Sequence, residues 1–269
     1  MKTMKIAFIG GGAMGEAILA AVLNRGLSTP QAICVSDVKD ERRQYLKQTY
    51  QISVTDSNPD ASAKGEVIIL AIKPQNLPEI MPGLSGRIKP GQLVLSIIAG
   101  ASIDTLCKGI DHRQVVRVMP NTPAQIGEGI SVWTATPEVT EAQKEQARTI
   151  LSTMGKEIFV PDEKYLDMAT AVSGSGPAYF FLFVECLTEA AVRIGFSEDT
   201  AQELVLQTML GSGQLLKKSG KSPSELRRMV TSPGGTTAAA LQQFENENFR
   251  ELVYQAVAAA YHRAKELGK

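Results

Sequence analysis

Histidine, cysteine and tryptophan are scarce in this chain of 269 residues, which contains two, three and one of them, respectively. Neither His112 nor His262 has a partner at metal-ligand spacing, and no Cys-x-x-Cys occurs, so the sequence predicts no metal site. Both histidines are expected at the surface. Cys34, Cys107 and Cys186 are odd in number and far apart, which indicates reduced, buried thiols rather than a disulfide framework.

The chain also lacks an excess of charge of either sign and a long apolar run. Lys plus Arg and Asp plus Glu both number 28, so the formal net charge is zero and nothing indicates a nucleic-acid partner. The most apolar run, residues 178–184, is too short to span a bilayer. The first expected strand begins too early to leave room for a signal peptide. We therefore expect a cytoplasmic protein with no membrane span.

What the chain does have is a glycine-rich turn between an apolar run and a helix-forming segment. Residues 6–9 predict a buried strand, and residues 16–24, rich in Ala and Leu, predict a helix. Gly10, Gly12 and Gly15 fit the G-x-G-x-x-G pattern. In such a turn the first glycine permits a tight bend, the second lets a pyrophosphate approach, and the third lets the helix pack on the strand. Because free N–H groups at the helix start face the phosphates, the sequence predicts a dinucleotide site.

Two indications about the choice of dinucleotide conflict. Asp37 ends the second expected strand, about 20 residues beyond the last glycine, where an acidic side chain binds the ribose 2′-hydroxyl of NAD. Lys39, Arg42 and Arg43 follow closely and favour a 2′-phosphate, although they fit a solvated helix face equally well. The sequence therefore leaves both NADPH and NADH open.

Alternating apolar runs and helical segments predict a doubly wound, mostly parallel sheet in the first part of the chain. Further strands are expected over residues 32–36, 52–54, 67–72, 92–98, 114–119, 129–134 and 157–160. The strand at 129–134 is expected to be an antiparallel addition. Beyond Pro161 no strand is expected, and helices are predicted over residues 165–172, 177–195, 198–218, 236–246 and 248–265. The fold class is thus α/β, with a Rossmann-type dinucleotide-binding domain, residues 1–161, followed by an all-α domain, residues 162–269.

Several loops carry residues suited to ligands. Lys73 follows an expected strand, and because ligands of such sheets bind beyond the carboxyl ends of strands, it is predicted near the cofactor. Residues 120–123 form a stiff Pro-Asn-Thr-Pro loop, either a ligand contact or an ordinary turn. Residues 173–179 combine glycine and serine at a helix start, and a ligand contact and a tight turn are both open. Residues 230–237 resemble an anion nest of backbone N–H groups, so a small carboxylate is the expected ligand and a capped turn the alternative.

Together these segments resemble the pyrroline-5-carboxylate reductase family of proline biosynthesis, along the whole chain. The matching segments follow the family's order and are residues 8–15, 71–74, 119–123, 173–179 and 231–237. The resemblance implies an oxidoreductase that reduces 1-pyrroline-5-carboxylate to L-proline by hydride transfer from NADPH or NADH. It also implies a homodimer or higher homo-oligomer, with residues 162–269 as the substrate and dimerisation domain. Asp37 departs from the family, whose members often carry a small hydroxyl residue there and prefer NADPH.

The resemblance further implies roles for individual residues. The cofactor would be bound by Ile9, Gly10, Gly11, Gly12, Ala13, Met14, Asp37, Asn58, Ala71, Ile72, Lys73, Pro74, Ile97, Ile98 and Ala99. The substrate would be bound by Ser232, Gly234, Gly235, Thr236 and Thr237. Thr237 is the candidate catalytic residue, because its hydroxyl is expected to meet the ring nitrogen. A related β-hydroxyacid dehydrogenase is the main alternative, but it would need a lysine in the segment 173–195, which contains none.

Overall fold

The computed structural model describes residues 3–268, which form two compact units. One unit runs to Ser175 and takes in the segment from Ala260 onward, and the other is Gly176–Ala259. Ala260 lies within the last helix, α12 (Phe249–Leu267), so this helix contributes to both units. The functional division after residue 161 stays a prediction. Among the helices of residues 3–268, none combines the length and apolarity that crossing a membrane requires.

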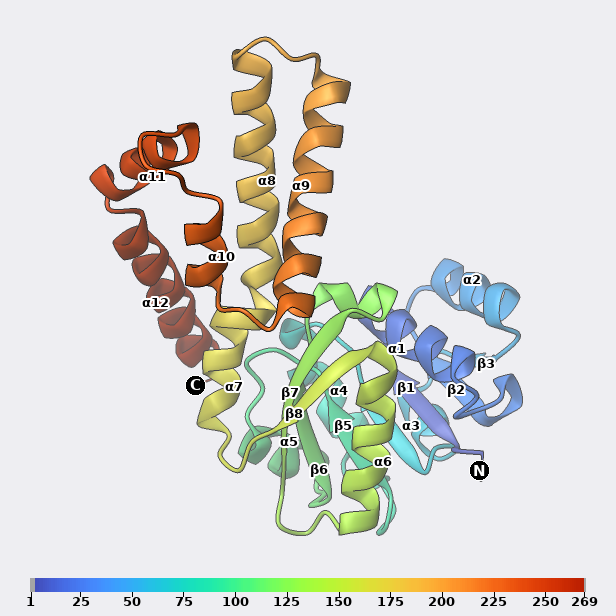
Figure 1. Cartoon of the computed structure of the whole chain (residues 1–269). Helices are drawn as coiled ribbons and strands as arrows, with labels where there is room; N and C mark the ends of the chain where they lie inside the picture. The colour runs from blue at the N-terminus through green and yellow to red at the C-terminus, as the bar shows by residue number, and fades with distance from the viewer. Residues whose placement is uncertain (1–2, 269) are drawn as a thin grey trace. The chain divides into compact units, whose positions relative to one another are not determined.

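Within residues 3–268, the first unit is built on one eight-stranded sheet of order β3-β2-β1-β4-β5-β6-β7-β8 (Figure 1). The strands are β1 (Ile6–Ile9), β2 (Ile33–Ser36), β3 (Ser53–Thr55), β4 (Val67–Leu70), β5 (Leu93–Ser96), β6 (Val115–Met119), β7 (Gly129–Ala135) and β8 (Gly155–Phe159). Neighbouring strands run parallel except β6 and β7, which run antiparallel. The predicted parallel sheet with one antiparallel addition is confirmed.

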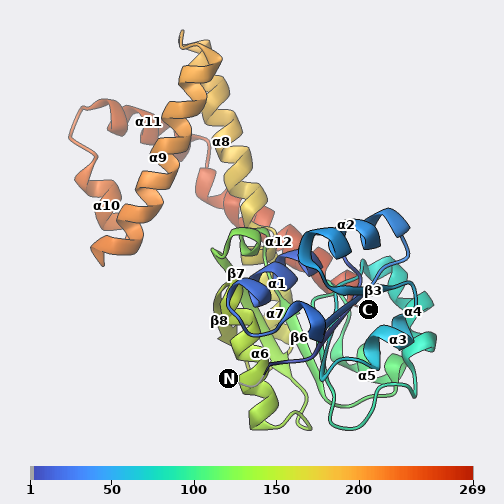
Figure 2. The same ribbon diagram turned by 90° about the vertical axis from the view of Figure 1, so that its right-hand side faces the viewer.

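Helices cover both faces of this sheet (Figure 2). One face carries α1 (Ala13–Asn24), α2 (Asp40–Tyr50) and α6 (Glu141–Leu151), and the other carries α3 (Asn58–Ser62), α4 (Leu77–Leu84) and α5 (Ile103–Ile110). Successive residues of a strand point to opposite faces. In β1, Phe8 therefore lies in one apolar core and Ile9 in the other. Because both faces of the sheet are buried there, the central strands β1 and β4 are unbroken apolar runs in the sequence.

Two expectations about single residues are wrong. His112 is buried rather than exposed, and its Nε2 lies 2.8 Å from the carbonyl oxygen of Gln92, because the turn after α5 packs against the start of β5. The cysteines are not all buried: Cys34 is, but Cys107 is half-buried and Cys186 is exposed on α8 (Gly176–Arg193). The expected exposure of His262 is confirmed.

The second unit contains helices and almost no core of its own. Besides α8 and part of α12 it holds α9 (Glu198–Ser219), α10 (Pro223–Met229) and α11 (Thr236–Asn246). Helices α8 and α9 run side by side (Figure 1). Side chains cap the starts of two of these helices, since Ser197 accepts the Thr200 N–H at α9 and Ser222 forms a capping box with Glu225 at α10. Of the apolar side chains described in residues 176–259, only Ala201 and Val205 are buried.

Candidate functional site

The carboxyl ends of β1, β4 and β5 meet at one edge of the sheet. Ile9 pairs with Leu70, and the Ala71 N–H then donates to the Ile9 carbonyl at 2.8 Å. On the next strand, the Ile97 N–H donates to the Leu70 carbonyl at 3.1 Å. Strand order reverses between β1 and β4, which is where ligands of such sheets bind. The structure thus brings together the predicted cofactor segments 9–14, 71–74 and 97–99.

The glycines of the turn differ in what surrounds their missing side chains. A Cβ at Gly10 would lie 2.6 Å from the Ala71 carbonyl oxygen, and its φ of +96° favours glycine. A Cβ at Gly11 would lie 2.6 Å from a side-chain carbon of α2, and one at Gly15 would lie 2.8 Å from the Gly10 carbonyl oxygen. At Gly12, no described atom lies within 4 Å. Packing within the fold therefore accounts for Gly10, Gly11 and Gly15, whereas Gly12 borders open space.

This open space lies at the start of α1, where an anion is favoured. Gly12 is the N-cap of α1, and its carbonyl accepts the Glu16 N–H at 2.8 Å. The preceding N–H groups, including those of Ala13 and Met14, have no carbonyl partner within a helix. Together with the helix dipole they attract negative charge. The residues present therefore fit the pyrophosphate of a dinucleotide, which would fill the space that a Gly12 side chain would take.

Two polar side chains are held in place near the end of β2. Asp37 Oδ2 accepts the Gly11 N–H at 2.9 Å, and Asp37 Oδ1 accepts the Lys39 N–H at 2.9 Å. Asn58, the first residue of α3, accepts the hydroxyl of buried Ser36 at 2.7 Å. The two residues predicted for the adenosine end thus follow or contact the same strand, and only Asp37 also contacts the glycine turn.

A polar cluster behind the glycine turn was missed by sequence reasoning. Glu16 forms an ion pair with Arg42 and accepts the hydroxyls of Tyr45 and Tyr50 at 3.1 and 2.8 Å. Arg42 Nε in turn donates to the Gly11 carbonyl at 2.5 Å. Although burial opposes ionisation of Glu16, the hydrogen bonds from Arg42 and the tyrosines lower its pKa below the ordinary value. Burial, followed by the bond to Glu16, raises the pKa of Tyr50 to about 12.

The remaining predicted cofactor residues differ in exposure. Lys73 and Pro74 are exposed after β4, and Ile97 and Ala99 are half-buried after β5. Ile98 is buried in the apolar core under α4 and α5, so its side chain contributes packing. In the neighbouring loop, Asn121 Oδ1 accepts the Ile130 N–H at 2.9 Å, which fixes the chain after β6.

In the second unit, the predicted substrate residues form the turn before α11. Gly234 has a φ of +71°, and the Gly235 N–H donates to the Ser232 carbonyl at 3.1 Å. That N–H is therefore committed within the turn. The N–H groups that begin α11, starting with Thr236, have no partner within a helix. Ser232, Gly234 and Thr236 are exposed and Thr237 is half-buried, so the turn presents hydroxyls beside a helix start.

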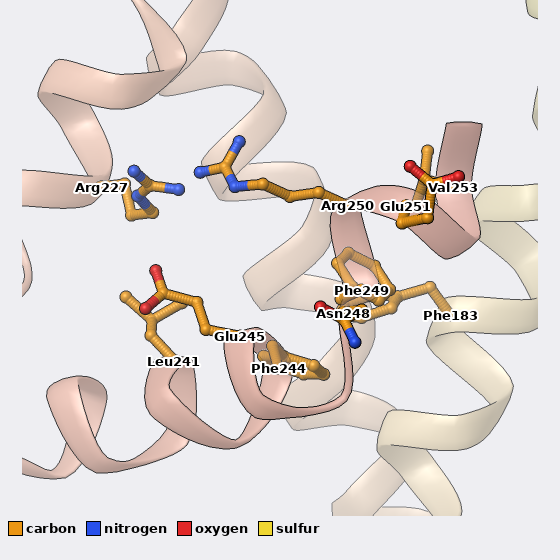
Figure 3. Close-up of a pocket in the computed structure, with 10 residues that line it drawn as sticks. All are labelled: Phe183, Arg227, Leu241, Phe244, Glu245, Asn248, Phe249, Arg250, Glu251 and Val253. Atoms are coloured by element: carbon orange, nitrogen blue, oxygen red, sulfur yellow. The ribbon is translucent and has the colours of Figure 1, made fainter. Parts of the chain in front are cut away.

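A cavity of about 750 Å³ lies elsewhere in the second unit. Figure 3 shows the residues that line it. It is lined by Phe183, Arg227, Leu241, Phe244, Glu245, Asn248, Phe249, Arg250, Glu251 and Val253. Ring centroids of Phe244 lie 6.5 Å from Phe183 and 5.2 Å from Phe249, so aromatic rings form part of its wall. None of the predicted substrate residues lines it, and we do not assign the substrate to it.

Comparison with known proteins shows which family shares this arrangement. A family model for pyrroline-5-carboxylate reductase dimerisation matches residues 163–267. A model for NADP oxidoreductase, coenzyme F420-dependent, matches residues 5–100. The pyrroline-5-carboxylate reductase of Synechocystis sp. is 41% identical over 99% of this chain and 99% of its own. The chain belongs to the pyrroline-5-carboxylate reductase family.

Solved reductases share the fold of the whole chain. The pyrroline-5-carboxylate reductase of Coxiella burnetii has a TM-score of 0.88 at 36% identity, with 100% of both chains covered. The pyrroline carboxylate reductase of Plasmodium falciparum, solved with NADP bound, has a TM-score of 0.87 at 32% identity, again with 100% of both covered. The predicted fold class, with its Rossmann-type part followed by a helical dimerisation part, is confirmed, as is the prediction of an oxidoreductase. The match to a dimerisation model also confirms self-association, in agreement with the nearly coreless second unit.

Proposed function

We propose that this chain reduces 1-pyrroline-5-carboxylate to L-proline with hydride from NADPH or NADH, the final step of proline biosynthesis, in the cytoplasm. The observation that carries the proposal is the open space at Gly12, the one glycine of the turn that internal packing does not require. A dinucleotide pyrophosphate explains that space, and family membership supplies the substrate. In this proposal the two predicted domains have different roles. Residues 1–161 bind the cofactor, and residues 162–269 bind the substrate and form the dimer interface.

In the first domain, the N–H groups from Gly12 to Met14 would bind the pyrophosphate. Asp37 and Asn58 would border the adenosine ribose. Residues 71–74 and 97–99, which follow β4 and β5, would line the nicotinamide side. The bound cofactor supplies the hydride, and the protein's contribution is to fix the position of the two reacting rings.

In the second domain, the turn before α11 is the proposed substrate site. The free N–H groups of Thr236 and Thr237 would bind the carboxylate, with the hydroxyls of Ser232 and Thr236 beside them. The Thr237 hydroxyl would hydrogen-bond the ring nitrogen. A protonated imine is electrophilic at carbon, so the reaction needs positioning more than a strong general base. We further propose a homodimer in which two chains complete each active site.

The test is oxidation of reduced nicotinamide, followed by its absorbance band, with and without 1-pyrroline-5-carboxylate. We expect loss of absorbance that requires the substrate and is matched by the proline formed. Absence of substrate-dependent oxidation with both NADPH and NADH would reject the proposed activity.

A further inference from the structure

We infer that this chain discriminates against the 2′-phosphate of NADPH and favours NADH. The inference rests on the proposed function, because it requires the glycine turn to bind a dinucleotide. Three observations support it. The carboxylate of Asp37 is fixed at the end of β2, Arg42 is bonded within the fold, and so is Arg43.

The carboxylate of Asp37 is fixed from both sides. Its two oxygens accept the N–H groups of Gly11 and Lys39, each at 2.9 Å, and its own N–H donates to the Thr55 carbonyl at 3.2 Å. It therefore contacts the pyrophosphate turn itself and cannot swing away without breaking two hydrogen bonds. A carboxylate has acceptor sites left for ribose hydroxyls. A 2′-phosphate in the same place would set its negative charge against the negative charge of the Asp37 carboxylate. The phosphate would also have few protons to donate to the carboxylate oxygens.

Arg42 is committed to holding the turn. Its guanidinium donates to the Gly11 carbonyl and to Glu16, and it lies 5.0 Å from the ring centre of Tyr45. Recruiting it to a 2′-phosphate would leave the partly buried Glu16 carboxylate without its cation, which is costly. The arginine that the sequence offers as a phosphate ligand is instead part of the support for Gly11.

Arg43 is similarly engaged. Its Nη1 donates to the carbonyls of Asp37 and Val38 at 2.7 and 3.1 Å, and its Nη2 donates to Asp40 at 2.9 Å. Of Lys39, Arg42 and Arg43, only Lys39 is exposed and has no ion pair within residues 3–268. One flexible ammonium group beside a fixed carboxylate is a poor site for a doubly charged phosphate.

The test is direct titration of each cofactor, read by the fluorescence of bound reduced nicotinamide with no substrate present. Wild type should bind NADH at least about 10-fold more tightly than NADPH. Asp37→Asn keeps the size of the side chain and one acceptor for its neighbours while removing the charge, and Asp37→Ser removes the carboxylate altogether. Both should shift the NADH-to-NADPH affinity ratio toward NADPH by roughly 10- to 100-fold. Glu41→Gln, which removes an equal charge from an exposed position on α2, is the matched control and should leave the ratio unchanged.

The outcomes separate this inference from the proposed function. Wild type that binds NADPH as tightly as NADH, or Asp37 variants that keep the wild-type ratio, would overturn the inference while the reductase activity stands. An equal shift of the affinity ratio in Glu41→Gln would also overturn it. The shift would then come from the loss of any negative charge on the protein, and not from the position of Asp37. Failure of wild type to bind either cofactor would reject the cofactor site itself.

Discussion

Gly12→Val should abolish cofactor binding while leaving the fold intact. The backbone at Gly12 has φ −66° and ψ −179°, an extended conformation that valine adopts without strain. An added Cβ would meet no described atom within 4 Å. The remaining cost is loss of a favourable N-cap residue, about 1 kcal/mol or less of the free energy of unfolding. The melting temperature of the cofactor-free protein should therefore fall only slightly.

The loss in binding should be far larger. The valine side chain would occupy the space beside the first N–H groups of α1 and keep the pyrophosphate from reaching them. Each hydrogen bond to a charged group contributes roughly 1.5–3 kcal/mol, and two of them contribute roughly 3–6 kcal/mol. That corresponds to an increase in Kd of about 100-fold or more. Fluorescence titration with NADH and NADPH, beside thermal denaturation without cofactor, measures both quantities.

Gly10→Ala is the matched control, because its added Cβ would lie 2.6 Å from the Ala71 carbonyl oxygen and its φ is +96°. It should lower the stability of the fold by about 1–3 kcal/mol even without cofactor. If Gly12→Val bound both cofactors as tightly as wild type, the pyrophosphate would not lie at this turn. If it lowered stability as much as Gly10→Ala, Gly12 would be a packing residue and the reasoning from open space would be wrong.

Three further predictions concern the substrate turn, the oligomer and the cluster behind the glycines. Thr237→Val and Thr237→Ala should each lower kcat/KM for 1-pyrroline-5-carboxylate about 5- to 150-fold with unchanged cofactor affinity; full activity in kinetic assays would make the turn structural. Ala256→Arg, at an exposed site on α12, should give inactive monomers or insoluble protein, and fully active monomers in sedimentation would refute a shared active site. Because the folded pKa of Glu16 lies below 4.5, its ionised form stabilises the fold above that pH and the contribution is lost on further acidification. Glu16→Gln should flatten the acid dependence of unfolding free energy in denaturant titrations, and an unchanged dependence would contradict this assignment.

Most of the parallel sheet could be predicted because its determinants are local. The central strands β1 and β4 are short apolar runs, and some helix starts carry side-chain caps such as Ser197 and Ser222. The helices α3, α4 and α5 were not predicted. The first has five residues, the second contains Pro82 and the third has eight residues, so none is long enough for its apolar period to stand out. Packing against the sheet stabilises them, and packing is not a local property of the sequence.

The sequence predicts the location of the candidate site, but not the side-chain contacts that hold the glycine turn in place. The G-x-G-x-x-G spacing locates the turn, yet only the neighbours in space show which glycine is left free for a ligand. Glu16 reaches Arg42 and Tyr50 across 26 and 34 positions of sequence, a separation at which no spacing rule applies. His112 is expected at the surface because it lies in a polar loop, whereas its ring is buried beside Gln92, the residue before β5.

The most direct test of the proposed reaction is isotope transfer. NADH carrying deuterium at both C4 positions of the nicotinamide would be incubated with the protein and 1-pyrroline-5-carboxylate, and the proline analysed by mass spectrometry. The account predicts one deuterium in each proline formed, on the ring carbon that was the imine carbon. Proline without deuterium, or oxidised cofactor without proline, would contradict it.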